Sequence, residues 1–187
     1  MADLQSAVIT VLPQFLDRIV GGTIILLSFA MCGRAAEQRN VGELMVADAD
    51  NMRATFIKCN NAYFEGKLPI PLFDLLHSFR TCGYYQYTAG GWFDKTVYDP
   101  KIFITDYYGF TEKQFVDIMA HEMIHYYLAY LGLDKRCRHG KKFKEMAEWL
   151  NMRHGLHITS EVDLSQYKRR EGTPSLSYWL VKKIYMT

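Results

Sequence analysis

Residues 121–125 read His-Glu-Met-Ile-His, and this stretch decides how the rest of the chain is interpreted. On an α-helix, positions i and i+4 lie one above the other, so the imidazoles of His121 and His125 can hold one zinc ion. Glu122 follows the first histidine, and from there its carboxylate can reach a water on the open metal site and act as a general base. A chain of this composition is expected to match the pattern by chance roughly 0.01 times. The alternative, two core histidines with Glu122 as their partner, buries three polar groups at a high free-energy cost.

The motif lies inside a helix that the sequence predicts over residues 111–131. Thr111 and Gln114 have the spacing of a capping box, and Glu112 places a negative charge where the helix dipole favours it. Gly132 is a natural stop. The inward-facing positions of this helix follow helical spacing and include the motif itself: Ile118, His121, Glu122, His125 and Leu128.

A catalytic zinc usually needs a third protein ligand. The short spacing with a third histidine six residues after the second is absent, because Leu131 occupies that position. Two kinds of candidate remain further along the chain: His139, and Glu145 or Glu148 on the helix that follows it. We favour His139 over Glu145.

The segments around the motif predict a mixed α+β domain. Residues 47–64 have the apolar spacing of an amphipathic helix, and residues 139–154 predict a helix that ends at Gly155. Residues 72–105 are rich in aromatic and β-branched side chains and predict two or three short antiparallel strands, of which 101–105 is the clearest. We therefore expect a single domain in which a small antiparallel sheet packs on the motif helix and its flanking helices.

The chain resembles the SprT-like family of zinc metalloproteases, which includes the DNA–protein crosslink protease Spartan. The resemblance rests on HEMIHYYL at residues 121–128 and HGKKFKEM at residues 139–146, and it covers about residues 50–158. It implies a zincin-like fold and one catalytic Zn²⁺ held by His121, His125 and His139, with Glu122 as the base. It further implies hydrolysis of peptide bonds in DNA-associated proteins. The sequence departs from the family in having no C-terminal four-cysteine zinc ribbon and in its hydrophobic N-terminus.

Positive charge is concentrated in the last third of the chain. Residues 1–134 carry 10 basic and 15 acidic groups, whereas residues 135–187 carry 12 basic and 5 acidic groups. Such a surface favours polyanionic partners, and we expect salt-sensitive contacts with single-stranded or damaged DNA. The alternative is a solvated charged surface. Lys168-Arg169-Arg170 and Lys182-Lys183 extend the basic surface, and Tyr178 and Trp179 could stack on unpaired bases. The candidate contacts lie in residues 135–144 and flank the proposed third ligand: Lys135, Arg136, Arg138, Lys141, Lys142 and Lys144.

The sequence also predicts how the chain is divided. Residues 1–44 form a hydrophobic N-terminal extension, residues 45–160 the SprT-like domain, and residues 161–187 a basic and aromatic tail. The fifteen uncharged residues 19–33 are fewer than the roughly 20 needed to span a bilayer. They predict membrane contact only if they form a signal or an anchor; the alternatives are a buried helix or sequence upstream of a start at Met45. Four scattered cysteines without a CxxC pair favour a reducing, cytoplasmic compartment.

These observations predict a zinc metallopeptidase that acts on a protein substrate and needs no small-molecule cofactor. Two other classes stay open: a nucleic-acid-binding module with a structural zinc, and a secreted or membrane-attached metallopeptidase without a DNA role. A purely structural zinc site would not require Glu122, which argues against the first class. The three remaining histidines, which lack ligand spacing, are expected to be structural or exposed: His77, His154 and His157.

Overall fold

A computed structural model describes residues 44–90, 96–134, 136 and 138–173. The predictions for residues 19–33, for Lys135 and for the tail residues after Thr173 fall outside this range. None of the helices within it is long and apolar enough to cross a membrane. The elements, in chain order, are α2 (Ala49–Tyr63), β1 (Leu72–Leu76), β2 (Gly83–Ala89), β3 (Val97–Thr105), β4 (Tyr108–Gly109), α3 (Glu112–Tyr130), α4 (Lys141–His154), the 3₁₀ turn η2 (Leu164–Gln166) and β5 (Lys168–Arg169).

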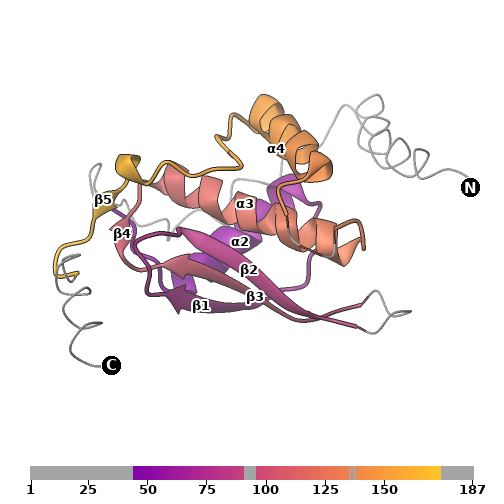
Figure 1. The fold of residues 1–187 in the computed structure, drawn as a ribbon, viewed down its shortest axis with the longest axis horizontal. Coiled ribbons are helices and arrows are strands. Elements are labelled where there is room, and N and C mark those ends of the chain that lie inside the picture. Colours follow the sequence, from indigo (N-terminus) through magenta and orange to yellow (C-terminus); the bar gives the residue numbers. More distant parts are fainter. Residues whose placement is uncertain (1–43, 91–95, 135, 137, 174–187) are drawn as a thin grey trace, which may run out of the picture. The chain divides into compact units, whose positions relative to one another are not determined.

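The main sheet has three strands in the order β1-β3-β2 (Figure 1). β2 pairs with β3 in the antiparallel sense, as predicted, and Tyr85 lies opposite Ile102. β1 pairs with β3 in the parallel sense, with Phe73 opposite Ile102, so the sheet is mixed and not purely antiparallel. The reason is topological: β3 turns back from β2 and inserts between β2 and β1, so that it runs in the direction of β1. The predicted α+β class is confirmed.

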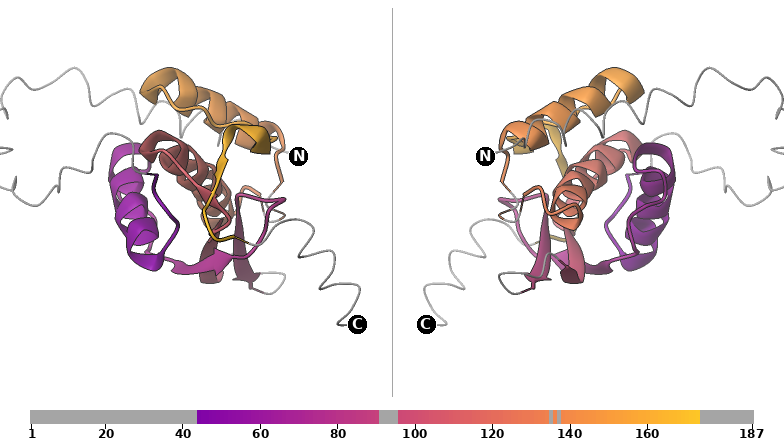
Figure 2. Two further views of the ribbon diagram at one scale, coloured as in Figure 1. Left: turned by 90° about the vertical axis from the view of Figure 1, so that its left-hand side faces the viewer. Right: turned by 90° about the vertical axis from the view of Figure 1, so that its right-hand side faces the viewer.

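Two helices cover one face of this sheet (Figure 2). α2 packs over β1 and against α3, while α3 packs over β2 and β3. Asp48 caps α2 by accepting a hydrogen bond from the Asn51 backbone N–H at 2.8 Å. The inward face of α2 buries Met52 and Phe56, and the Phe56 ring lies 6.4 Å from that of Tyr126 on α3.

α3 is the central helix of the domain. Its capping box is complete, since the Thr111 hydroxyl accepts from the Gln114 N–H at 3.2 Å and the Gln114 side chain accepts from the Thr111 N–H at 2.9 Å. The sheet and α2 lie on one side of α3, and α4 packs on the other. This central position explains why apolar residues surround much of the helix instead of forming a single stripe.

α4 begins at Lys141, two residues later than the sequence predicts. Gly140 is its N-cap and has an extended backbone, so His139 lies outside the helix. α4 packs on α3 through Phe143, Ala147 and Leu150. It ends at Gly155, whose φ of 67° is left-handed and therefore suits glycine.

The chain beyond α4 returns across the domain. β5, which the sequence analysis assigned to a tail, pairs with β4, with Arg169 opposite Tyr108. The Tyr167 ring lies 5.3 Å from that of Phe110. At the other end of the described range, Met45 forms an antiparallel bridge with Phe110. Both ends of the range are therefore packed on the segment that leads into α3.

Candidate metal centre

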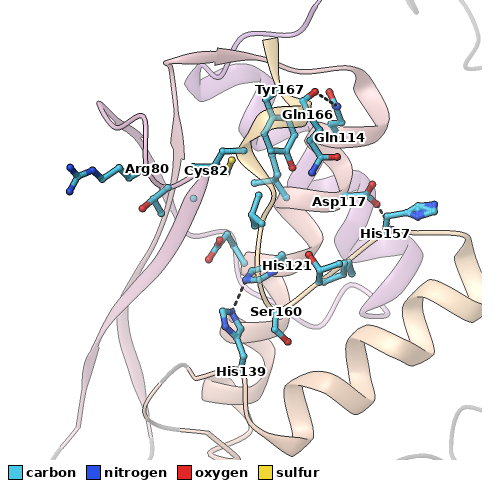
Figure 3. Close-up of a pocket in the computed structure, with 18 residues that line it drawn as sticks. Arg80, Cys82, Gln114, Asp117, His121, His139, His157, Ser160, Gln166 and Tyr167 are labelled. Carbon is cyan, nitrogen blue, oxygen red and sulfur yellow. Dashed lines mark hydrogen bonds between the residues drawn. The ribbon is translucent and has the colours of Figure 1, made fainter. Parts of the chain in front are cut away.

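Three histidine side chains converge beside α3, two of which, His121 and His139, are shown in Figure 3. His121 and His125 lie one turn apart on α3, and His139 reaches them from the turn that precedes α4. The Nε2 atom of His139 is 2.9 Å from Nε2 of His121 and 3.1 Å from Nε2 of His125. The structure therefore brings together the three residues selected from the sequence as metal ligands.

The chemistry of these nitrogens fits a tetrahedral cation. A proton on Nε2 of His139 can form one good hydrogen bond to a neighbouring imidazole nitrogen, but it cannot form two at once. Nitrogens bound tetrahedrally to zinc at 2.0–2.1 Å would lie roughly 3.3 Å apart, close to the distances between these atoms. The set of three imidazoles also leaves a fourth position open, as in catalytic zinc sites.

The surroundings keep the histidines neutral. Burial, with smaller contributions from His125 and His139, lowers the pKa of His121 to about 3. Burial and then His139 lower the pKa of His125 to about 4, while burial and Lys144 lower the pKa of His139. Since only the neutral imidazole binds a metal, the triad is in its binding form at neutral pH.

Phe143 of α4 packs against all three imidazoles. Its ring centroid lies 4.8 Å from that of His121, 4.6 Å from that of His125 and 4.6 Å from that of His139. The sequence places Phe143 within the helix predicted over residues 139–154, but it gives no sign that this ring would pack on the three histidines.

Glu122 is buried between α3 and β2, with 4% of its surface exposed. Burial raises the pKa of its carboxyl group to about 8, and a hydrogen bond from the Tyr85 backbone partly opposes this shift. Gly83 makes this close approach of β2 possible. A Cβ at residue 83 would lie 3.1 Å from Glu122 Oε1 and 2.8 Å from the Phe103 carbonyl oxygen. Nothing in the pattern of residues 72–105 marks Gly83 for this role.

The turn that presents His139 is organised by Asp134. Its carboxylate accepts hydrogen bonds from the backbone N–H groups of Arg136 at 2.9 Å and Arg138 at 3.2 Å. The alternative ligand Glu145 is exposed and lies 3.7 Å from Lys141 in an ion pair. Within the described residues, Glu145 and Glu148 are not part of the metal-competent group. The geometry thus favours His139 over Glu145.

The predicted basic segment surrounds this turn. The side chains of Arg136, Arg138, Lys141 and Lys144 are exposed. Lys142 is half-buried and directs its ammonium group to the Leu133 carbonyl oxygen at 3.4 Å. The described cations of the segment therefore lie on both sides of His139 in the chain. Two of them, Lys141 and Lys142, also contact other groups of the domain.

A pocket of about 360 Å³ adjoins the triad (Figure 3). α3 contributes Gln114, Asp117 and His121 to its wall, as do Cys82, which precedes β2, and Gly83, the first residue of β2. The opposite wall is formed by residues 157–167. His157 lies here, away from the triad, whereas His77 pairs with Asp106 at 2.7 Å and the His154 ring lies 4.8 Å from that of Tyr63.

Comparison with protein families matches residues 52–162 to the model of the SprT-like family, which is more than half of the chain. The match begins inside α2 and ends beyond α4, so it includes Glu122 and all three converging histidines. No curated protein matches the chain.

Proposed function

This chain belongs to the SprT-like family, and from that premise we propose that it is a zinc-dependent metallopeptidase. Family membership indicates a metallopeptidase-like domain. One observation carries the finer proposal: three neutral imidazoles converge next to the buried carboxyl group of Glu122. A structural zinc site would need a fourth protein ligand and would have no use for Glu122.

Each of these residues has a separate role in the proposed hydrolysis. His121, His125 and His139 would hold one Zn²⁺, which when bound polarises the scissile carbonyl and acidifies water. In its ionised form, which the positive charge of a bound zinc would favour, Glu122 takes the proton from the attacking water and returns it to the nitrogen of the leaving amine. The Tyr85 backbone fixes the Glu122 carboxylate, and the missing side chain at Gly83 leaves space for it.

The decisive experiment compares two glutamine variants of the full chain, each loaded with zinc, on an unfolded protein substrate. Glu122→Gln should reduce the rate of cleavage by about 10²–10⁴-fold, because it removes the general base. It should still bind one zinc per chain. Glu145→Gln, on the exposed face of α4, is the matched control and should cleave normally. Cleavage by Glu122→Gln at the wild-type rate would exclude the mechanism.

We propose further that the substrates are proteins associated with DNA. The support is the position of the basic segment: a polyanion held by Arg136, Arg138 and Lys144 would lie beside the turn that carries His139. Lys141, Lys142 and Lys144 also lie in the first turn of α4, where the helix dipole disfavours positive charge. An anion bound there would relieve that repulsion.

This second proposal is tested with a basic DNA-binding protein as substrate, with and without single-stranded DNA. We expect DNA to accelerate cleavage, and the acceleration to fall as salt rises, because phosphate contacts release counterions. Replacing Arg138 and Lys144 with glutamine should weaken the acceleration without changing cleavage in the absence of DNA. If the cleavage rate is the same with and without DNA, the chain is a general metallopeptidase and the proposal of DNA-associated substrates is wrong.

A further inference from the structure

The segment of residues 156–160, here called the return segment, lies directly after α4 and beside His121 (Figure 3). Leu156 and Ile158 are buried, with 6% and 4% of their surfaces exposed. Thr159 and Ser160 line the pocket together with His121. The return segment is therefore part of the wall of the metal centre, although none of its side chains is a ligand.

Its backbone contacts a metal ligand. The backbone of Thr159 forms a hydrogen bond with the His121 imidazole and raises the pKa of His121, opposing the larger effect of burial. A group that favours the protonated ring must accept a hydrogen bond, so the partner is the Thr159 carbonyl oxygen. With Nε2 of His121 directed at His139, this bond holds the remaining ring nitrogen, Nδ1.

Two polar side chains fasten the return segment just before Thr159. Asn151 of α4 forms a reciprocal pair with Ile158, donating to its carbonyl oxygen at 2.9 Å and accepting from its N–H at 2.8 Å. Asp117 of α3 accepts from the His157 N–H at 2.9 Å, as Figure 3 shows. Lys113 completes the arrangement, because its ammonium group lies 3.5 Å from Asp117 and donates to the Gly155 carbonyl at 2.9 Å.

We propose that Asn151 and Asp117 are positioning residues, which hold the return segment so that the Thr159 carbonyl fixes the tautomer and the ring orientation of His121. Asp117 lies one turn before His121 on α3, so the helix and the return segment act together on one imidazole. A histidine that ligates a metal generally donates its other N–H to such a partner, and losing the partner typically weakens metal binding by 10–100-fold. The inference rests on the proposed metal site.

The test measures zinc affinity of the full chain by competition with a chelator. Asp117→Ala and Asn151→Ala should each weaken zinc binding by about 10-fold or more. Asp117→Asn should restore most of the affinity, since its amide oxygen can still accept from His157. If Asn151→Ala does not fold, Asn151→Asp replaces it; this variant keeps the acceptor for Ile158, loses the donor, and should bind with intermediate affinity.

The matched control is Asp48→Ala. It also removes a carboxylate that accepts from a backbone N–H, but at the start of α2, away from the metal centre. It should lower the unfolding temperature without changing zinc affinity. A second readout is the Nδ1 proton of His121 in nitrogen-resolved NMR spectra of the zinc-loaded protein. This proton should exchange slowly with solvent in the wild type and in Asp48→Ala, and quickly in Asp117→Ala.

Two results would separate this inference from the proposed function. A wild-type chain that binds no zinc would overturn both. A wild-type chain that binds zinc tightly, with Asp117→Ala and Asn151→Ala within twofold of it, would overturn the positioning role alone. In that case the return segment would contribute only to the stability of the fold.

Discussion

At the scale of single residues, the buried Glu122 makes folding of the metal-free chain depend on pH. Its pKa is about 8 in the folded chain against an ordinary value of 4.5. Between these values the folded chain keeps a proton that the unfolded chain has lost, so this residue destabilises the fold progressively as pH rises. The stability of the fold is undiminished by this residue below pH 4.5, and part of it is lost as pH rises from 4.5 through 8.

We therefore expect the free energy of unfolding of Glu122→Gln to rise relative to wild type between pH 4.5 and 8. The difference should grow by a few kcal/mol across that range, since each pKa unit corresponds to about 1.4 kcal/mol. Urea unfolding of the two metal-free chains at pH 5, 6.5 and 8 measures it. A difference that stays constant with pH would show that Glu122 is not buried in this way.

Gly83 is the second residue whose effect can be tested. A methyl group at this position would lie 2.8 Å from the Phe103 carbonyl oxygen, which belongs to the backbone of β3 and cannot simply rotate away. Gly83→Ala should therefore displace β2 from Glu122, slow peptide cleavage, and reduce the free energy of unfolding by about 1–3 kcal/mol. Gln86→Ala, at an exposed position of the same strand, is the control for both measurements. Normal cleavage by Gly83→Ala would mean that this close approach is unnecessary.

At the scale of elements, α3 depends on its capping box as well as on its packing. Thr111→Ala removes the acceptor for the Gln114 N–H and should lower the free energy of unfolding by about 1 kcal/mol. The corresponding fall in unfolding temperature is a few degrees for a domain of this size. Thr111→Ser keeps the hydroxyl and should unfold close to wild type. An equal fall in both variants would assign the loss to the methyl group instead of the cap.

The helices could be predicted from the sequence because their signals are local. Thr111 and Gln114 mark the start of α3, and Gly155 ends α4, within a few residues of where the structure has them. The parallel pairing of β1 with β3 could not be predicted, because insertion of β3 between two strands depends on contacts distant in sequence. The two-residue error at the start of α4 is smaller but matters for function, since a helical His139 would project from α4 itself.

In the candidate site, too, local patterns could be predicted from the sequence, whereas contacts between distant residues could not. The histidines were found from the i, i+4 spacing and from the family resemblance, which are properties of the sequence. Gly83 and Asn151 were missed because their roles depend on which backbone group lies opposite them in the folded domain. Asn151 lies on a face of α4 that has no recognisable sequence pattern. Only the return of the chain after Gly155 gives it a partner.

At the scale of the whole domain, the proposed zinc would add a direct link between the central helix and the turn before α4. His121 and His125 belong to the central helix, whereas His139 belongs to the exposed turn that leads into α4. A cation bound to all three would therefore hold α4 and the return segment against α3. Binding of this kind stabilises the folded chain by mass action, because the unfolded chain does not present the three nitrogens together.

We expect zinc to raise the unfolding temperature of the chain and a chelator to reverse the change. At a free zinc concentration of 100 times the dissociation constant, the stabilisation is about 2.7 kcal/mol. His139→Ala should lose most of this shift, since two histidines from one helix cannot connect α3 to α4. His157→Ala is the matched control: its side chain lines the same pocket but lies outside the triad, so the shift should persist. Equal shifts in the two variants would mean that zinc binds elsewhere, and the third ligand would then have to be sought outside the turn before α4.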